Sequence, residues 1–280
     1  MKRADQVICG FAPVFRGQLY YEVSGSGNPI LFIHAGVADC SMWDDQITFF
    51  SQYYRVIRYD TRGFGRSITE TTQFSNRQDI LDLFAHLQVE KAIVVGISRG
   101  GQIAIDFTLE YPMYVLALIA AASGISGYDY QPDDSEKARR EFEFFTHADE
   151  LWEHQAFDQL AELEAHLWAD GPSQPVGRAS PTIRDYVRNI VRENYVRQDG
   201  QATPIPLDPL AVNRLSEIRV PTLILVGEYD TVSTLATAGK LAREIPDARQ
   251  ILISGAAHML PMEKPALFNE TILNFLRSEI

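Results

Sequence analysis

The sequence has few cysteines, no long hydrophobic run and no block of positive charge. Its two cysteines, Cys9 and Cys40, form neither a metal-binding spacing nor a disulfide framework. The longest apolar stretches, such as VLALIAAASGI from Val115, fall far short of the roughly 20 residues that cross a bilayer. The first 15 residues, MKRADQVICGFAPVF, lack a continuous apolar segment of signal-peptide length. We therefore expect a cytoplasmic protein that does not bind membranes.

Positive charge is scarce relative to negative charge. The chain carries 25 Lys and Arg against 37 Asp and Glu, a formal net charge of -12, and no run of five basic residues. A negative surface repels phosphate backbones and anionic headgroups. Nucleic acid is therefore a poor candidate partner, and a small molecule is the better one.

Short apolar runs alternate with segments of helical periodicity. Of the 280 residues, 46% are apolar, which is enough for one large α/β domain with an insertion or for two small domains. Strands that are apolar on both faces belong in a mostly parallel sheet covered by helices. The expected strands are LYYEV, ILFIHAG, YRVIRYD, KAIVVGIS, VLALIAA, PTLILVGEYD and ARQILISGAAH. The expected helices between them are SMWDDQITFFSQY, NRQDILDLFAHL, GGQIAIDFTLEY, TLATAGKLAREI and EKPALFNETILNFLRSEI.

The alternation stops in residues 126–215, where no convincing strand occurs. This stretch holds acidic helical sequence, a linker rich in Pro and Gly (GPSQPVGRASP) and a further helix, TIRDYVRNIVRENYVRQ. We expect an all-helical cap over 126–215, inserted between two strands of a core formed by 1–125 and 216–280. Insertions on this side of a sheet often act as lids, because ligands bind outside the carboxyl ends of the strands.

The stretch VVGISRGGQIAI places Ser98 between an apolar strand and an amphipathic helix. Gly96 and Gly100 leave room for a sharp turn there, so the serine hydroxyl is exposed at the amino end of the helix. Unpaired N–H groups and the helix dipole favour negative charge at that place. A G-x-S-x-G pattern is short enough to occur by chance, but its strand and helix context favours a nucleophile.

At this point the chain resembles the α/β-hydrolase family over nearly its whole length. FIHAGVADCSMW is similar to that family's oxyanion loop, YDTRGFGRS to the segment after the next strand, and VGISRGG to its nucleophile elbow. PTLILVGEYDTVS and GAAHMLPMEKP are similar to the segments that carry its acid and its histidine. The resemblance implies an α/β-hydrolase fold and a catalytic triad, and it is far less specific for the substrate.

The serine needs a base, and six histidines compete for that role. His258 lies in a loop directly after the last expected strand, where an imidazole can reach the serine, and it is our candidate. The family resemblance makes His34 a structural hydrogen-bonding residue. The others are expected to lie on helices, His86 either packed or at the surface and the remaining three at the surface; a metal site formed by His147, Glu150 and His154 is the weaker interpretation. These others are His86, His147, His154 and His166.

The third member of a triad is a carboxylate that orients the imidazole. Asp230 follows the strand LILVGEY and has the family's position for the acid, and the order Ser98, Asp230, His258 fits the fold. Glu228 is a possible substitute that we expect to serve the turn instead, and Asp129 is a remoter one.

The oxyanion of the transition state needs main-chain donors. One is expected from the N–H of Arg99, and the resemblance places the second at Gly36, with Val37 as the weaker alternative. The sequence departs from the family at Ala35, where a glycine is usual, and at Arg99, where many relatives have an uncharged residue. The Arg99 side chain either pairs with a nearby carboxylate, which we favour, or attracts an anionic substrate.

The expected cap carries two further patterns. Arg184, Arg188 and Arg192 recur every fourth residue and form a basic row on one helix face. Salt bridges to acidic cap helices explain this row better than a carboxylate-binding wall. Five aromatic residues supply apolar surface that either lines an acyl pocket or is simply core: Phe142, Phe144, Phe145, Trp152 and Trp168.

Together these features predict a serine hydrolase that needs no cofactor and no metal. Ser98 attacks a small carboxylic ester or lactone, His258 acts as base and acid, and the N–H groups of Gly36 and Arg99 hold the oxyanion. A serine in place of an aspartate separates the chain from haloalkane dehalogenases and epoxide hydrolases. Two alternatives stay open: cleavage of a carbon-carbon bond or an enol-lactone in an acidic substrate, and a non-catalytic receptor on the same fold. We expect a monomer or a homodimer.

Overall fold

The computed structural model describes residues 7–70, 72–197 and 202–280. Its strands are β1 (Ile8–Val14), β2 (Gly17–Ser24), β3 (Pro29–Ile33), β4 (Arg55–Tyr59), β5 (Ile68–Thr69), β6 (Gln73–Phe74), β7 (Ala92–Ile97), β8 (Val115–Ala121), β9 (Thr203–Pro204), β10 (Thr222–Gly227) and β11 (Arg249–Ile253). Its helices are α1 (Asp44–Phe50), α2 (Asn76–Leu87), α3 (Arg99–Glu110), α4 (Glu136–Glu153), α5 (Phe157–Ala165), α6 (Pro181–Arg197), α7 (Val232–Glu244), α8 (Leu260–Glu263) and α9 (Pro265–Glu279). The π-helical turn η3 (His166–Asp170) follows α5 directly.

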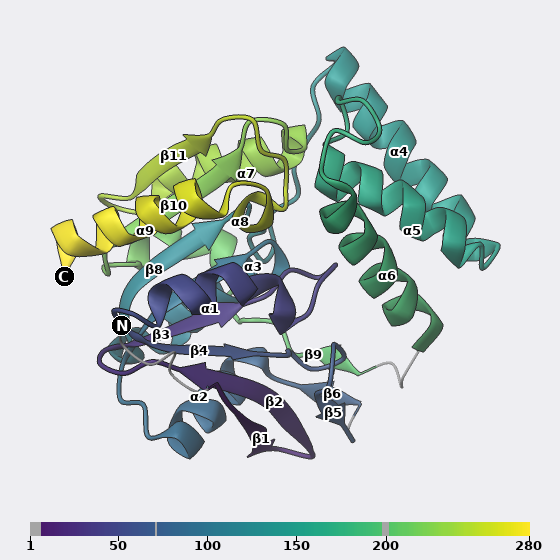
Figure 1. Ribbon diagram of the computed structural model, residues 1–280. Helices are drawn as coiled ribbons and strands as arrows, with labels where there is room; N and C mark the ends of the chain where they lie inside the picture. The colour runs from purple at the N-terminus through teal and green to yellow at the C-terminus, as the bar shows by residue number, and fades with distance from the viewer. Residues whose placement is uncertain (1–6, 71, 198–201) are drawn as a thin grey trace.

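One sheet runs through the molecule in the order β1-β2-β4-β3-β7-β8-β10-β11, with β5 paired to β2 (Figure 1). The pairs from β4 to β11 are parallel, whereas β1 and β2 are antiparallel to their neighbours. The fold class expected from the sequence is therefore correct. Strand β3 lies between β4 and β7, so the chain places β4 on one side of β3 and then crosses to place β7 on the other side. Open α/β sheets bind ligands at such a switch point, outside the carboxyl ends of the strands.

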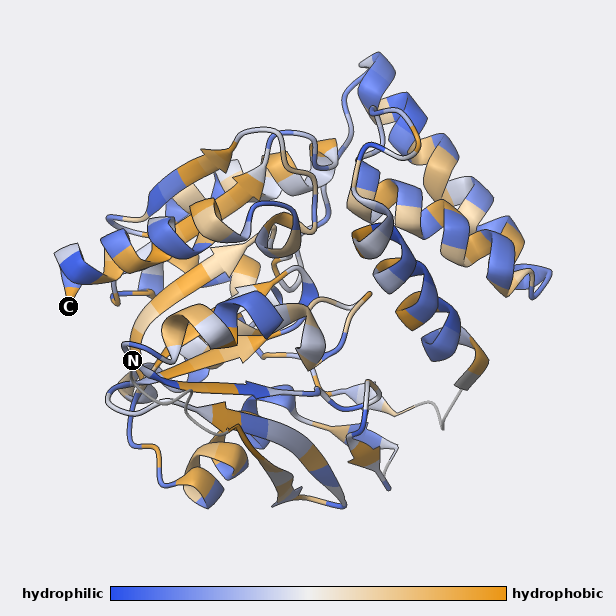
Figure 2. Cartoon of the chain, viewed as in Figure 1, coloured by the Kyte–Doolittle hydropathy of each residue, from blue (hydrophilic) through white to orange (hydrophobic). Residues whose placement is uncertain are grey.

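The central strands are buried on both faces because helices cover both. All six residues of β7 are buried. Ile93 and Val95 pack in one hydrophobic cluster, and Val94 packs in a second cluster on the opposite face. Figure 2 shows the strands of the sheet as largely hydrophobic ribbon, with polar residues on the outer faces of the helices.

The chain between β8 and β10 forms a separate layer of helices, α4, α5, η3 and α6, which we call the cap helices (Figure 1). They lie beside the ends of the parallel strands. The longer elements of this stretch are helices, but β9 pairs with β6 in a two-stranded sheet. A strand of two residues has no hydrophobic periodicity, so β9 could not be predicted from the sequence. Gln198, the expected end of the last cap helix, lies outside the described residues.

The edges of the sheet differ most from the sequence expectations. Strand β1 was not expected, since its sequence ICGFAPV contains Gly and Pro and its residues are largely exposed. Strand β11 was expected to be buried, yet four of its five residues are exposed because it is the other edge. Among the described residues, which do not include residues 1–6, no helix is long and apolar enough to span a membrane.

Candidate active site

Ser98 occupies the sharp turn between β7 and α3. Its φ of 56° lies in the left-handed region, which residues with a side chain rarely adopt. The Ser98 N–H donates to the carbonyl oxygen of Ala121 at 2.9 Å, and its own carbonyl oxygen accepts from the N–H of Gln102 at 3.0 Å. The turn is thus held by the neighbouring strand β8 on one side and by the first turn of α3 on the other.

The glycines around Ser98 are required by close backbone contacts. A Cβ on Gly96 would lie 2.1 Å from the carbonyl oxygen of Gly100. A Cβ on Gly100 would lie 2.3 Å from the carbonyl oxygen of Ile33, at the end of β3. Both distances are well inside van der Waals contact, so no side chain fits at either position. This is the physical reason for the spacing that the sequence shows.

Asp230 and His258 form a hydrogen-bonded pair after β10 and β11. His258 Nδ1 lies 3.0 Å from each carboxylate oxygen of Asp230. An ionised carboxylate only accepts hydrogen bonds, so Nδ1 carries the proton and Nε2 is free to accept one. The N–H of Thr231 donates to the same carboxylate at 2.8 Å. His258 and Asp230 are both buried, with exposed fractions of 3% and 6%.

The pair and the serine all lie after the carboxyl ends of parallel strands. No hydrogen bond joins Ser98 to His258 among the described residues. The His258 ring instead packs against the indole of Trp168, with ring centroids 4.5 Å apart. Trp168 belongs to η3, so a cap residue lies directly on the candidate base. The structure brings together two of the three expected residues, Asp230 and His258, and places Ser98 at the end of β7, which β8 separates from β10.

The two alternative carboxylates are engaged elsewhere. Glu228 accepts hydrogen bonds from the Ser254 hydroxyl at 2.8 Å and from the N–H of Gly255 at 2.9 Å, so it serves the turn as expected. These two bonds lower the pKa of Glu228, the Gly255 bond contributing most. Asp129 is exposed and accepts a hydrogen bond from Gln131.

His34 is a structural residue at the end of β3. Its Nε2 accepts the N–H of Thr61 at 2.9 Å, so the proton must be on Nδ1, which lies 2.7 Å from the carbonyl oxygen of Ala35. Burial lowers the pKa of His34 to about 4, which keeps the ring neutral near pH 7. This neutral ring joins the loop after β3 to the loop after β4.

The remaining histidines lie away from the pair. His86 is exposed on α2 near the hydroxyl of Tyr21, and His166 contacts Asp170 within η3. His147 lies near the Glu150 carboxylate, whereas His154 contacts the Glu150 carbonyl oxygen, so the three side chains do not converge. No cluster of three or more metal-ligating side chains occurs in the described ranges.

Gly36 and Arg99, the two expected oxyanion residues, are neighbours. A Cβ on Gly36 would lie 3.7 Å from both Cβ and Cδ of Arg99. Within the described part of the chain, neither main-chain N–H has an acceptor. Two unpaired N–H groups beside a serine at the amino end of a helix suit a developing negative charge. Val37, the weaker alternative, is half-buried in the same loop.

The expected pairing of the Arg99 side chain with a carboxylate is wrong. Arg99 Nη1 donates to the hydroxyl of Thr61 at 2.7 Å, and the guanidinium lies over the ring of Phe64, 4.6 Å from its centroid. No carboxylate lies within ion-pair distance among the described residues. Burial lowers the pKa of Arg99 to about 10, so the group stays charged near pH 7. The contacts with Thr61 and Phe64 join residues distant in sequence, and no local signal reveals them.

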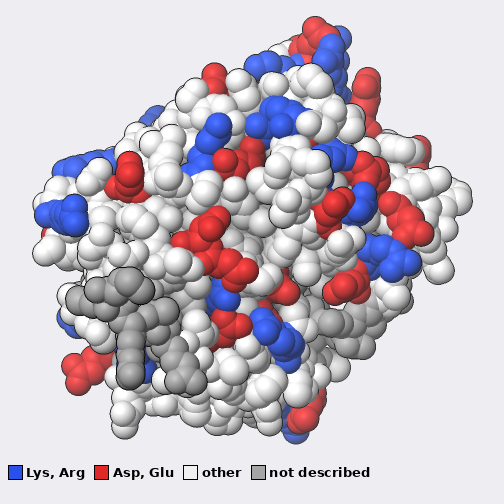
Figure 3. Space-filling model, in the orientation of Figure 1, with Lys and Arg blue, Asp and Glu red and all other residues white. Residues whose placement is uncertain are grey.

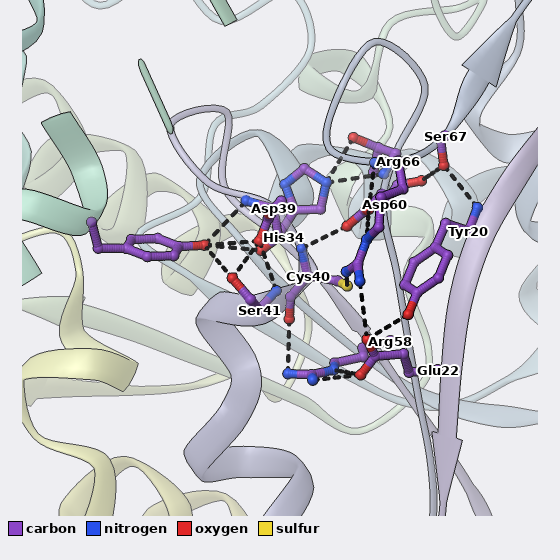
Figure 4. A network of polar contacts seen from close by, with 12 residues as sticks. Tyr20, Glu22, His34, Asp39, Cys40, Ser41, Arg58, Asp60, Arg66 and Ser67 are labelled. Carbon is purple, nitrogen blue, oxygen red and sulfur yellow. Dashed lines mark hydrogen bonds and ion pairs between the residues drawn. The ribbon is translucent and has the colours of Figure 1, made fainter. Parts of the chain in front are cut away.

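A polar network fixes the loops around His34 (Figure 4). Asp60 accepts the N–H of Cys40 at 2.9 Å and the N–H of Arg66 at 2.8 Å. Burial acts to raise the pKa of Asp60, but the hydrogen bonds from Arg66 and Cys40 outweigh it and the pKa is lowered. Arg58 in turn bonds Glu22 and Asp44. The network ties the loop that carries Gly36 to the segment YDTRGFGRS.

One cap helix reaches the candidate oxyanion loop. The hydroxyl of Tyr186, on α6, lies 3.1 Å from the Asp39 carboxylate and accepts the Asp39 N–H at 3.2 Å. The Ser41 hydroxyl lies 3.2 Å from the Tyr186 hydroxyl oxygen. Sequence reasoning missed Tyr186, since nothing in a helical pattern indicates which distant loop a side chain meets.

The linker GPSQPVGRASP is ordered around Asp170. This fully buried carboxylate accepts the N–H of Ala179 at 2.8 Å and pairs with Arg184. Arg178, within the linker, donates to the Gly255 carbonyl oxygen at 3.1 Å and pairs with Glu263. Glu263 also accepts the N–H of Ala257, next to His258. The linker therefore connects the cap helices to the loop that carries the candidate base.

The basic row on α6 is paired with acidic side chains, as expected. Arg184 pairs with Glu162 as well as Asp170, Arg188 pairs with Asp185, and Arg192 pairs with Asp158. Figure 3 shows the same mixture on the molecular surface, where basic and acidic side chains alternate. The row is not a free carboxylate-binding wall.

The cap aromatics divide into two groups. Trp168 meets His258, and Phe145 packs near Trp168. Trp152 packs with Tyr195 in a cluster on the cap itself, and Phe142 is 69% exposed. Of the described ring contacts of these residues, that of Trp168 is the one that reaches His258.

Comparison with known proteins gives a consistent picture. The family model of the alpha/beta hydrolase fold matches residues 28–265. The chain is 27% identical over 275 residues to 3-oxoadipate enol-lactonase 1 of Acinetobacter baylyi, covering 93% of both chains. It is 26% identical over 274 residues to 2-hydroxy-6-oxo-6-phenylhexa-2,4-dienoate hydrolase of Comamonas testosteroni, covering 92% of this chain and 91% of that one. A malate-bound thermophilic esterase from Thermogutta terrifontis matches with a TM-score of 0.75 and 25% identity, covering 98% of each chain. These relatives support a hydrolase on this fold, and the chain belongs to the alpha/beta hydrolase fold family.

Proposed function

We propose that the protein is a serine hydrolase that cleaves a small carboxylic ester or lactone through an acyl-enzyme. The observation that carries the proposal is the buried Asp230–His258 hydrogen bond at 3.0 Å, formed at the sheet edge where Ser98 has its strained turn. A buried carboxylate that holds Nδ1–H leaves Nε2 as a base, which is the arrangement that activates a serine hydroxyl.

The reaction has two halves. Ser98 Oγ bonds to the substrate carbonyl carbon while its proton passes to His258 Nε2, and the oxyanion accepts the N–H groups of Gly36 and Arg99. The imidazolium then protonates the leaving alcohol, and the carbon–oxygen bond breaks to leave an acyl-serine. Water, deprotonated by His258, attacks the acyl group, and the proton returns to Ser98 as the acid departs. Asp230 stabilises the imidazolium in both halves. In a lactone, the leaving alcohol stays attached to the acyl group.

The mechanism requires Ser98 Oγ to approach His258 Nε2. Catalytic hydrogen bonds are often formed or shortened only when substrate is bound. Trp168 packs on the His258 ring, so substrate entry beside the cap helices would also reposition this indole.

We assign residues 126–215 to a cap and 1–125 with 216–280 to the catalytic core. The contacts of Trp168 with His258 and of Tyr186 with Asp39 support a cap that covers the substrate. We also propose a small-molecule substrate and no cofactor, since every step above uses only side chains and main-chain donors of this chain.

A second reaction is favoured by one observation, the unpaired Arg99 guanidinium. The same three residues would cleave an enol-lactone or a carbon-carbon bond of an acidic substrate, and two relatives are named for such reactions. A receptor without catalysis is the third possibility, because a fold does not fix a function.

Turnover of p-nitrophenyl butyrate by the purified protein and by Ser98→Ala tests the proposal. We expect hydrolysis that falls by about 1,000-fold or more in the variant, with an unchanged circular dichroism spectrum. Fast loss of a coloured dienoate with slow ester turnover would assign carbon-carbon cleavage instead. Tight ligand binding with no turnover, equal in wild type and variant, would assign a receptor and refute the proposal.

A further inference from the structure

The Arg99 side chain is a cation without a counter-ion in a strongly acidic protein. Other arginines with little exposed surface, such as Arg62 and Arg184, pair with carboxylates. The half-buried Arg99 has a hydroxyl and an aromatic ring instead. A guanidinium has five N–H donors. Only one of them has an acceptor among the described residues, which leaves four without a hydrogen-bond partner in that part of the chain.

Arg99 also lines a cavity of about 140 Å³ that runs along α3. Gln102 lies one turn beyond Arg99 on the same helix and also lines the cavity, and no other described residue hydrogen-bonds its side-chain amide. A water molecule occupies about 30 Å³, so the cavity admits a carboxylate with a short carbon chain. Its opposite wall is the segment Pro204–Pro206.

The two other charged residues that line the cavity, Arg77 and Asp106, form no ion pair with Arg99. Arg77 pairs with Glu110 and donates to the carbonyl oxygen of Ile205 at 3.0 Å. Asp106 accepts the Ser126 hydroxyl at 2.7 Å, and its Cα lies about 10 Å along α3 from that of Arg99 by helical rise. The amino end of α3 adds positive potential at the Arg99 end. Of the two arginines that line the cavity, Arg77 therefore has a carboxylate partner among the described residues, and Arg99, at the amino end of α3, has none.

We propose that Arg99 and Gln102 bind a carboxylate of the substrate, so that the enzyme prefers acyl groups ending in a second carboxylate. This inference rests on the proposed function. Arg99 directly follows the nucleophile, and its Cβ and Cδ would contact a Cβ on Gly36, a candidate oxyanion donor. A substrate that presents its carbonyl to those N–H groups has its acyl chain beside the guanidinium. A planar fork of donors recognises a carboxylate through two parallel hydrogen bonds.

A matched pair of esters tests the proposal. Mono-p-nitrophenyl glutarate and p-nitrophenyl valerate have acyl chains of equal length, and only the first ends in a carboxylate. We expect the ratio of their kcat/KM values, anionic over neutral, to fall by about 10-fold or more in Arg99→Met, chiefly through KM. Arg99→Lys should fall between wild type and Arg99→Met, because an ammonium keeps the charge and loses the fork.

Arg188→Met is the control, since it removes a positive charge from an exposed ion pair on α6. Its ratio should stay within about twofold of the wild-type ratio. An unchanged ratio in Arg99→Met, or an equal fall in Arg188→Met, would overturn the proposal.

Binding to Ser98→Ala separates this proposal from the proposed function. Calorimetry should detect glutarate binding, at least about 10-fold weaker when Arg99→Met is added, and glutaramide, the neutral diamide, should bind weakly to both. Glutarate affinity that is independent of Arg99 would overturn the carboxylate site even if the enzyme is an esterase. Arg99-dependent binding in a protein without Ser98-dependent turnover would support the site while refuting the reaction.

Discussion

The end of the sheet that carries the candidate site and the cap helices beside it are held in place by different interactions. Around Ser98 the backbone itself is packed so closely that Gly100 approaches the Ile33 carbonyl oxygen, and the two glycines that permit this packing, Gly96 and Gly100, lie within five residues of sequence. The cap is held by side chains that meet across long stretches, such as Arg178 with Glu263 and Tyr186 with Asp39. Backbone contacts of the first kind leave a signature in the sequence, whereas side-chain contacts of the second kind do not.

The largest effect should come from Asp230, the proposed acid of the triad. Asp230→Asn keeps the shape but removes the charge that stabilises the imidazolium, and kcat/KM for p-nitrophenyl butyrate should fall by about 1,000-fold or more. The matched variant Glu228→Gln changes a carboxylate two residues away that only bonds the turn, so its kcat/KM should stay within about threefold. Equal losses in the two variants would show that Asp230 has no special role.

Gly100→Ala tests the backbone contact directly. Its methyl group would lie 2.3 Å from the Ile33 carbonyl oxygen, so we expect a loss of about 3 kcal/mol or more in the free energy of unfolding, or no folded protein. Gly239→Ala is the control on α7, where the nearest atom is the end of a flexible arginine at 3.3 Å. There a helical alanine should be neutral or stabilising by up to about 1 kcal/mol. Urea denaturation measures both, and a stable Gly100→Ala protein would contradict the account.

Two arginines of α6 test how the cap is held. Arg184→Ala leaves the fully buried Asp170 without its charge partner and should destabilise the cap by about 2–4 kcal/mol. Arg192→Ala breaks an exposed pair with Asp158 and should cost less than about 1 kcal/mol. Hydrogen exchange of the cap amides distinguishes local from global loosening. Similar effects of the two substitutions would mean that burial does not set the strength of these pairs.

Burial of Asp106 leads us to expect that the stability of the protein depends on pH. Burial raises its pKa to about 6 in the folded protein. Between its ordinary pKa near 4 and pH 6 the folded state binds more protons than the unfolded state, so stability falls as pH rises through this window. Asp106→Asn should therefore gain stability relative to wild type between pH 4 and pH 7.5, by up to about 3 kcal/mol. A stability difference that is independent of pH would contradict the assigned burial.

Tyr186→Phe gives the smallest expected effect and probes the join between cap and core. It removes the hydroxyl that meets Asp39 and Ser41, and we expect a loss of about 1 kcal/mol in stability with a fall of a few-fold in kcat/KM. A larger loss of activity than of stability would show that α6 positions the oxyanion loop. Unchanged activity with reduced stability would limit Tyr186 to a structural role.

The same contrast explains what the sequence could predict. The strand-turn-helix at Ser98 and the placement of His258 after the last strand were predicted from glycine spacing and from apolar runs, and the choice of Asp230 rested also on the family resemblance. The Arg99 side chain was predicted wrongly, because its partners Thr61 and Phe64 come from a loop 35 or more residues away. Strand β1 was missed since an edge strand need not be apolar. The contact of Trp168 with His258 depends on how the cap packs, which no local pattern specifies.

Reaction with a fluorophosphonate tests the central claim most directly, because this reagent bonds covalently to a serine that is activated by a neighbouring base. Peptide mass spectrometry of the labelled protein should find one adduct, on Ser98. Labelling should be lost in Ser98→Ala and slowed by about 100-fold or more in His258→Gln. An unlabelled Ser98 in the folded wild-type protein, or labelling that is unaffected by His258→Gln, would contradict the account.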